Sequence, residues 1–380
     1  MPLKSLRVID LTRILAGPFC TQLLADLGAD VIKIEGPRGD PVRQQGIMVD
    51  GLSWYFAQFN RNKKSVVLDL YGDSDKNTLS RLLETADVLV ENFRPGVLSD
   101  MGFGPGELEI LNPRLIHASV NGYGTTGPYA DRPSFDFIAQ AMSGFMSVNG
   151  PPDGEPQRAA PPISDLVAGL YCAFGILAAL HERESSGVGQ QVESSLTGGL
   201  ISMLAYLSAE YFATGEIPKR TGNDHPIVSP YGLFRAKDGM IAVAPSTDVY
   251  VEKFLSALGL EQLLSDPHYA TNSDRLLNRD ALSERINKVT CCQSVNHWIK
   301  AINHAGCPCG RVLDLAEVFE DPQVLAQDMV LNVPHPGHGN VRMTGFPVKL
   351  SRTPAGIQRP APDLGADTKE ILDKLDSRPL

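Results

Sequence analysis

The segment PPISDLVAGLYCA, residues 161–173, places a single carboxylate at the start of an otherwise apolar helical stretch. Two prolines preset an extended backbone and Ser164 is a natural N-cap, so Asp165 falls on the first turn of the predicted helix. A carboxylate held and ionised there is available as a nucleophile toward a carbonyl. Gly169, four residues on and on the same face, is expected to leave room for a substrate.

A purely structural role also accounts for Asp165. Acidic residues are common on first helical turns because they interact favourably with the helix dipole, by about 0.3–1 kcal/mol. Taken alone, the segment favours this structural role, so the nucleophile needs support from elsewhere in the chain.

The segment VENFRPGVLSDMGF, residues 90–103, is a second candidate for chemistry. A predicted strand ends at Asn92, and Phe93 and Arg94 follow in a stiff turn at the strand's carboxyl end, where α/β folds bind ligands. The ring of Phe93 offers a face to a base or a thioester arm. Arg94 offers a bidentate donor for phosphate.

Two other motifs are weaker. GYGTTG, residues 122–127, matches G-x-G-x-x-G, but the loop sequence PYADRPS follows it instead of the helix that a dinucleotide site requires. A surface turn is therefore favoured over NAD binding. The run FNRNKKS, residues 59–65, fits a solvated strand start and a phosphate contact equally well.

The cysteines do not predict a metal site. Cys291, Cys292, Cys307 and Cys309 have C-C and C-x-C spacing, which differs from the paired C-x₂-C of zinc sites. Reduced thiols in packing positions are the preferred interpretation, and no metal is expected.

Alternating apolar strands and amphipathic helices must position these candidates. Such alternation predicts an α/β fold with a mostly parallel sheet covered on both faces. We expect a large Rossmann-like domain over 1–219, a small α+β domain over 220–325 with a hairpin around residues 237–239, and a segment over 326–380 that rejoins the first. The predicted strands of the large domain are 6–11, 30–35, 64–70, 87–92 and 115–124, and its helices are 17–29, 75–86, 105–111, 135–147, 164–184 and 196–214.

Composition narrows the class of partner. The formal net charge of −10 argues against nucleic acid or an anionic membrane. We expect no membrane-spanning segment, because no run of about 18 uncharged apolar residues stands out. The N-terminal sequence lacks a signal-peptide core, so a cytoplasmic protein is predicted.

Several segments, taken in order between residues 5 and 330, resemble the family III CoA-transferases, the group that includes formyl-CoA transferase and the carnitine and bile-acid enzymes. They are VIDLTRILAGPFCTQLLADLGADVIKIE, SVVLDL, ADVLVENFRPGVLSDMGF, ASVNGYGTTGPYADRPSFDFIAQAMSG, PPISDLVAGLYCAFGILAAL and DPQV. The resemblance implies a homodimer of two interlocked rings. It also implies CoA thioesters as substrates and no permanently bound cofactor.

The resemblance assigns the nucleophile to the aspartate of its D-x-x-x-G motif, which is Asp165 with Gly169 here. Backbone N–H groups at the start of that helix are expected to hold the oxyanions of the reaction. The CoA contacts that the family implies are Leu15, Ala16, Arg38, Leu68, Leu70, Tyr71, Asn92, Phe93, Arg94, Phe135 and Asp136.

Two positions depart from the formyl-CoA transferase pattern, because Tyr71 and Asp100 stand where basic residues are expected. Phosphate contacts must then come from other cations. The candidates are Arg38, Arg43, Lys64 and Arg94.

The loop TGNDHPIVSPYGLF, residues 221–234, resembles that of dicarboxylate-specific family members. This resemblance implies succinyl-CoA as the donor. It also implies a short dicarboxylate as the acceptor, such as itaconate, mesaconate, citramalate, malate or glutarate. Arg13, Arg43 and His225 are candidate partners for the distal carboxylate.

Two alternatives stay open. Racemases of 2-methylacyl-CoA in this family use a histidine just before the motif aspartate, where this chain has Phe135, so transfer is favoured over two-base racemisation. A non-catalytic acyl-CoA-binding protein, with Asp165 as a plain first-turn acid, is the other alternative.

Overall fold

The computed structural model describes residues 1–377, which divide into two compact units. The first unit comprises Met1–Phe145, Arg158–Ser208 and the segment from Asp321. The second comprises Met146–Gln157 and Ala209–Glu320. All elements that surround Asp165 belong to the first unit.

A six-stranded parallel sheet forms the centre of the first unit, with strand order β5-β2-β1-β6-β7-β8. Five of these strands were predicted, and β8 was not. The short edge strand β8 has a polar, half-exposed sequence, QVESS, which lacks the apolar run of its neighbours. The strands are β1 (Arg7–Asp10), β2 (Asp30–Glu35), β5 (Lys63–Val67), β6 (Val88–Glu91), β7 (Ile116–Asn121) and β8 (Gln191–Ser195).

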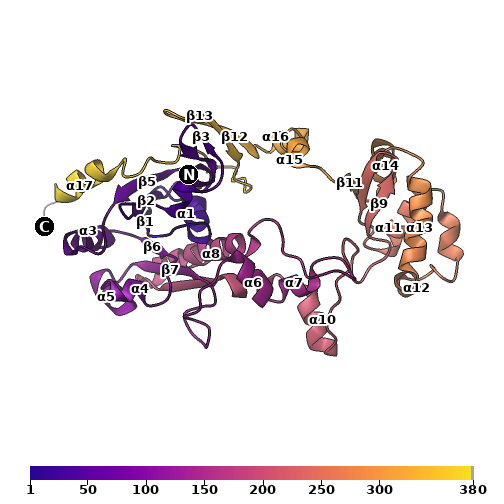
Figure 1. Ribbon diagram of the computed structural model, residues 1–380, viewed down its shortest axis with the longest axis horizontal. Helices are drawn as coiled ribbons and strands as arrows, with labels where there is room; N and C mark the ends of the chain where they lie inside the picture. Colours follow the sequence, from indigo (N-terminus) through magenta and orange to yellow (C-terminus); the bar gives the residue numbers. More distant parts are fainter. Residues whose placement is uncertain (378–380) are drawn as a thin grey trace. The chain divides into compact units, whose positions relative to one another are not determined.

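Helices cover both faces of this sheet, as the alternating sequence pattern predicts (Figure 1). On one face, α1 (Ala16–Asp26) and α8 (Ile163–Ser186) share a core with Val8, Val88 and Ile116. The opposite core includes Ile9 and Leu89 and is closed by α3 (Asp73–Leu83), α4 (Val97–Asp100), α5 (Pro105–Leu111) and α17 (Thr368–Asp376).

Two predicted helices are each broken in two. Gly144 and Ala205 adopt φ angles of 83° and 50°, a left-handed conformation that a continuous helix does not allow. The segments are α6 (Asp136–Met142), α7 (Phe145–Val148), α9 (Leu196–Ser202) and α10 (Tyr206–Thr214).

A third core of the first unit joins the segment after β2 to a C-terminal hairpin. Val42 and Phe56 pack there against Val333 and Val341. The elements are η1 (Pro41–Gln44), β3 (Met48–Val49), β4 (Leu52–Ser53), α2 (Trp54–Asn60), α16 (Pro322–Ala326), β12 (Val330–His335) and β13 (Gly339–Thr344).

The second unit has its own antiparallel sheet, with strand order β11-β10-β9, and its own core around Phe254, Ile286 and Trp298. The predicted hairpin around residues 237–239 is confirmed as β9–β10. The elements are β9 (Gly232–Ala236), β10 (Gly239–Val243), η2 (Glu261–Ser265), β11 (Cys309–Arg311), α11 (Asp248–Ala257), α12 (Asn272–Leu277), α13 (Arg279–Thr290), α14 (Val295–His304) and α15 (Leu315–Val318).

Helix α8 is long and apolar enough, by length and composition, to cross a membrane, which the sequence analysis did not expect. The buried share of its apolar window is 44%, and core helices pass the same test, so this is weak evidence for a span. Part of its apolar surface is uncovered in the single chain. Leu170 and Phe174 are 51% and 68% exposed, and Tyr171 and Leu177 continue the same exposed row.

Candidate active site

Asp165 lies in the wall of a cavity of about 280 Å³ at the carboxyl end of the parallel sheet. Three connections meet there, because parallel strands all end at the same edge. The turn after β1 contributes Arg13–Ala16, the turn after β6 contributes Asn92–Pro95, and the loop after β7 contributes residues up to Phe135.

The local structure of the α8 start differs from the prediction in one detail. Asp165 lies on the first turn, as expected, but the helix begins at Ile163 with Pro162 in the N-cap position. The prediction of Ser164 as N-cap is therefore wrong. The backbone N–H and the hydroxyl of Ser164 both donate to Asp136 Oδ1, at 2.9 and 2.8 Å. Asp136, a residue of α6, therefore caps the start of α8 in place of Ser164.

Burial changes the acidity of Asp165. The pKa of its carboxyl rises to about 7, mainly because burial disfavours the charge and additionally because the Asp136 carboxylate lies nearby. The expectation of a fully ionised group at neutral pH is thus wrong. The two protonation states of Asp165 are balanced there, and the ionised form is more basic than an ordinary carboxylate.

The start of α8 offers fewer free donors than expected. The N–H of Ile163 donates to the carbonyl of Pro161 at 2.8 Å, and the N–H of Ser164 is used by Asp136. These two groups are therefore not available to an oxyanion in this conformation.

Gly169 serves packing rather than substrate access. A Cβ atom at this position would lie 2.4 Å from the carbonyl oxygen of Ala16 and 3.1 Å from Phe19 Cδ1. The space that glycine leaves is therefore filled by α1, and the expectation of room for a substrate is wrong. The close approach of the two helices instead brings Ala16 and Asp165 to one cavity.

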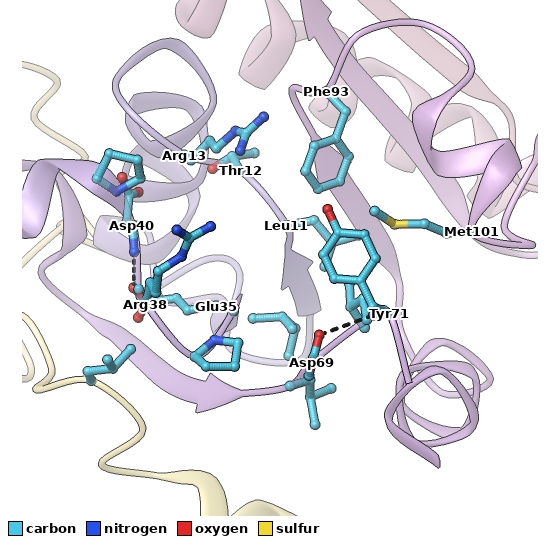
Figure 2. Close-up of a pocket in the computed structure, with 18 of the residues that line it drawn as sticks. Leu11, Thr12, Arg13, Glu35, Arg38, Asp40, Asp69, Tyr71, Phe93 and Met101 are labelled. Carbon is cyan, nitrogen blue, oxygen red and sulfur yellow. Dashed lines mark hydrogen bonds between the residues drawn. The ribbon is translucent and has the colours of Figure 1, made fainter. Parts of the chain in front are cut away.

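A larger cavity of about 820 Å³ adjoins the Asp165 cavity, and Arg13, Pro41 and Phe93 border both. Figure 2 shows Phe93, Tyr71 and Met101 on one side of it and Arg38 on the other. The side chains of Arg13 and Arg38 point into the cavity between these two sides. The two cavities form an extended cleft with an apolar wall and cations along it.

Most residues that the family resemblance singled out border this cleft. Those beside Asp165 are Arg13, Leu15, Ala16, Asn92, Phe93, Arg94 and Phe135. Those of the larger cavity are Arg38, Leu68, Leu70 and Tyr71.

Asp136 does not fit the expected contact role. It is 8% exposed, and its carboxylate accepts from Ser164 and from Gln140 Nε2 at 2.8 Å. Within residues 1–377 it is not part of either cavity wall. Asp136 instead caps the start of α8 through Ser164, and its charge contributes to the raised pKa of Asp165.

Arg43 is also misassigned as a substrate contact. Its guanidinium makes a bidentate pair with Glu35, at 2.8 and 2.7 Å, and stacks 3.8 Å from the ring centroid of Phe56. Of the other proposed phosphate contacts, Lys64 pairs with Asp30 at 2.5 Å, whereas Arg38 and Arg94 line the cleft.

His225 belongs to the second unit, and its predicted role stays a prediction. Its ring lies 4.8 Å from that of Tyr231, and its carbonyl accepts from Arg279 at 2.8 Å.

Two residues beside the site were missed from the sequence. Arg132 lines the Asp165 cavity, with its guanidinium 3.8 Å from the ring centroid of Tyr129. Tyr55 has a raised pKa, because of burial and then the negative charges of Asp165 and Asp40, so its hydroxyl remains a donor at neutral pH. Neither residue stands in a spacing pattern that singles it out.

The described residues hold no group of three or more His, Cys, Asp or Glu side chains arranged to bind a metal ion. The charged side chains that line the Asp165 cavity are Asp165 itself and the cations Arg13, Arg94 and Arg132.

Comparison with known proteins gives a consistent result. Residues 3–368 match the family described as CoA-transferase family III. An acetyl-CoA:oxalate CoA-transferase of Acetobacter aceti is 41% identical, covering 96% of this chain and 93% of that protein. A succinyl-CoA–D-citramalate CoA-transferase of Chloroflexus aurantiacus is 37% identical, covering 98% of this chain and 94% of that protein. Among solved structures, a CAIB/BAIF family protein from Brucella suis matches with a TM-score of 0.88 and 36% identity, covering 99% and 100% of the two chains.

Proposed function

Because the chain belongs to CoA-transferase family III and is a transferase, we propose that it moves CoA between carboxylic acids through covalent intermediates on Asp165. The observation that carries this proposal is the position of Asp165. A carboxylate with a pKa near 7 lines the smaller cavity, which we call the inner end of the cleft. The larger cavity, which we call the outer end, has the size and cations for a nucleotide.

The proposed reaction begins when the Asp165 carboxylate attacks the donor thioester. The C–S bond breaks, and an aspartyl mixed anhydride and CoA thiolate form. The thiolate attacks the Asp165 carbonyl, which releases the donor acid and leaves an aspartyl-CoA thioester. The acceptor carboxylate attacks the carbonyl of this thioester, the C–S bond breaks, and a second mixed anhydride and CoA thiolate form. The thiolate then attacks the acceptor carbonyl of the anhydride, which gives the new CoA thioester and frees the Asp165 carboxylate. No thioester bond is lost to water in this sequence.

The environment of Asp165 supports this role. The raised pKa makes the ionised carboxylate a stronger nucleophile than a solvated one, because basicity and nucleophilicity rise together. Leu15 is the N-cap of α1 and lines the same cavity. The first N–H groups of a helix have no partner within it, so the start of α1 is our candidate donor to the oxyanions.

For substrates we favour succinyl-CoA as donor and a short dicarboxylate as acceptor. The relatives named above act on citramalate and oxalate, which are both dicarboxylates. Arg13 and Arg132 border the Asp165 cavity and are suited to a distal carboxylate. Arg43 is not part of this proposal, because its guanidinium pairs with Glu35.

An acceptor screen tests the substrate class. The enzyme is incubated with succinyl-CoA or acetyl-CoA and with oxalate, citramalate, mesaconate, itaconate, malate, glutarate, acetate or butyrate, and new thioesters are measured by mass spectrometry. We expect transfer from succinyl-CoA to at least one dicarboxylate and little to the monocarboxylates. Transfer to monocarboxylates alone contradicts the proposed class, and a preference for acetyl-CoA corrects the donor.

Racemisation is the weaker candidate, because Phe135 stands in the cavity wall where a second proton-transfer group would be needed. Incubation of a 2-methylacyl-CoA in D₂O should therefore leave the α-hydrogen in place. Deuterium incorporation would favour the racemase alternative.

We also propose that two copies of the chain associate, as the interlocked homodimer implied by the family resemblance. The exposed apolar row Leu170, Tyr171, Phe174 and Leu177 on α8 supports this, because large uncovered apolar surfaces mark interfaces. A second copy would cover the row without a membrane, in keeping with the predicted cytoplasmic location. Light scattering should give twice the chain mass, and a monomer would contradict the proposal.

A further inference from the structure

The turn that carries Arg13–Ala16 to the Asp165 cavity contains a strained residue. Ile14 has a φ angle of 70°, in the left-handed region that β-branched residues rarely adopt. Such a conformation costs about 1–3 kcal/mol and persists only where the surroundings hold it. Its side chain packs against the core that includes Phe56, and its backbone N–H donates to Asp40 Oδ1 at 3.2 Å.

Asp40 is itself held by a fully buried cation. Lys33 Nζ lies 3.0 Å from Asp40 Oδ2, and the two side chains are 0% and 1% exposed. The same Nζ donates to the carbonyl of Thr12 at 2.6 Å. One ammonium group therefore links the start of the turn to the carboxylate that fixes its middle.

Further buried contacts extend this arrangement in both directions. The N–H of Asp40 donates to Glu35 Oε2 at 2.9 Å, and Glu35 is the carboxylate that Arg43 clamps. The N–H of Thr12 donates to Asp10 Oδ1 at 2.8 Å. Arg43, which we expected at the substrate, instead pairs with Glu35, and Glu35 in turn contacts Asp40 beside the turn.

Asn92 holds the remaining part of the turn. Its side chain accepts from the N–H of Arg13 at 2.9 Å and donates to the carbonyl of Arg13 at 2.7 Å. Side chains therefore contact five successive polar groups of the backbone, from the N–H of Thr12 to the N–H of Ile14. Three of these partners, Asp10, Lys33 and Asp40, are buried charged side chains, and burying a charge is costly unless it is paired.

We propose that Asp40 and Lys33 are positioning residues for acyl transfer, which hold Ile14 in its left-handed conformation so that Leu15 and Ala16 face the reacting group on Asp165. This inference rests on the proposed function. Asp40 borders the larger cavity, but its side chain is only 1% exposed and that of Lys33 is fully buried, so neither side chain is expected to bind the substrate. Their contribution is to geometry, where a misplacement of about 1 Å can lower a rate about 10²-fold.

The test compares Asp40→Ala and Asp40→Asn with Asp30→Asn, a matched control. Asp30 lies on β2, the strand that also carries Lys33, and pairs with Lys64 at 2.5 Å, but it is 30% exposed and is not a lining residue of either cavity. For folded Asp40→Ala we expect kcat to fall about 10²-fold while the Kd for CoA, measured by calorimetry, changes less than about threefold. Asp30→Asn should retain both constants.

A second substitution separates positioning from general damage. Glycine adopts a φ angle of 70° without strain, so Ile14→Gly introduced into Asp40→Ala should restore part of the lost kcat while lowering Tm further, because the Ile14 packing is lost. A kcat for Asp40→Ala within about threefold of wild type, or no recovery in the double variant, overturns the inference.

If Asp40→Ala does not fold, Asp40→Asn decides the question, because it keeps an acceptor for the Ile14 N–H and loses only the ion pair with Lys33. A kcat equal to that of Asp30→Asn then overturns the inference. Asp165→Asn is measured in parallel. Retained transfer in that variant would contradict the proposed function itself, independently of the result at Asp40.

Discussion

The two ends of the cleft are built in different ways. At the inner end, backbone groups of residues 12–14 are held by side chains, of which Asp10, Lys33 and Asp40 are almost fully buried. At the outer end, part of the wall consists of exposed side chains, and Tyr71 is 90% exposed. Rigid geometry suits bond-making steps, and exposed side chains suit recognition of a flexible, charged ligand. Changes at the inner end should therefore affect rate, and changes at the outer end should affect binding.

The largest effect is expected at the inner end. Asp165→Asn removes the nucleophile with little change in shape, so transfer should fall by about 10⁴-fold or more, as when other enzymes lose a nucleophile. Steady-state assays with succinyl-CoA measure the loss, and calorimetry should show that CoA binding is retained. Substantial remaining transfer would mean that another group is acylated.

A smaller effect of the opposite kind is expected at the outer end. Arg38→Ala removes a cation that points into the larger cavity, and hydrogen bonds to charged groups contribute about 1.5–3 kcal/mol. KM for the CoA thioester should rise about 10- to 100-fold with kcat nearly unchanged. Arg81→Ala, which affects a surface pair with Asp376, is the control. A fall in kcat without a change in KM would contradict the division between the two ends.

The pH dependence of kcat reports on the inner end alone, because it follows the ionisation of Asp165. The ionised Asp165 is the reactive form and its pKa is about 7, so kcat should fall roughly tenfold for each pH unit below 7. Asp136→Asn removes the neighbouring charge and should move this acid limb to lower pH, whereas Asp131→Asn on the exposed loop should not. An acid limb near pH 4 in the wild type would contradict a buried nucleophile.

The smallest expected effect concerns stability. The pKa of Asp165 is raised from 3.8 to about 7 in the folded state, so the folded protein holds the proton more tightly than the unfolded chain. Ionisation therefore destabilises the fold progressively between about pH 4 and 7, and fully above pH 7. Asp165→Asn should be more stable than wild type by about 1–3 kcal/mol at pH 8 and equal to it near pH 4. Urea denaturation at both values measures this, and equal stability at pH 8 would contradict the raised pKa.

Sequence reasoning worked where local pattern determines structure. The βαβ alternation predicted five of the six parallel strands, and the apolar run after Asp165 predicted α8. It failed where a distant residue decides the outcome. Gly169 is explained by Ala16, about 150 residues earlier, and Ser164 is engaged by Asp136 from another helix. No spacing rule carries this information.

The charged residues show the same limit. Arg43 and Arg38 are both cations that follow β2, and only the structure separates the one clamped by Glu35 from the one that faces the cleft. Lys33 lies in an apolar strand, where its ammonium meets Thr12 and Asp40 only after folding. The sequence therefore predicted the elements and the nucleophile candidate, but not the contacts that hold the site.

The central claim is that Asp165 carries the acyl group and then CoA during turnover. The direct measurement is hydroxylamine trapping: the enzyme is incubated with succinyl-CoA, quenched with hydroxylamine, digested and analysed by tandem mass spectrometry. The account predicts a hydroxamate at Asp165 that forms only with the thioester present and is missing in Asp165→Asn. An unmodified Asp165 in an enzyme that is actively transferring CoA, or a hydroxamate on another carboxylate, would contradict it.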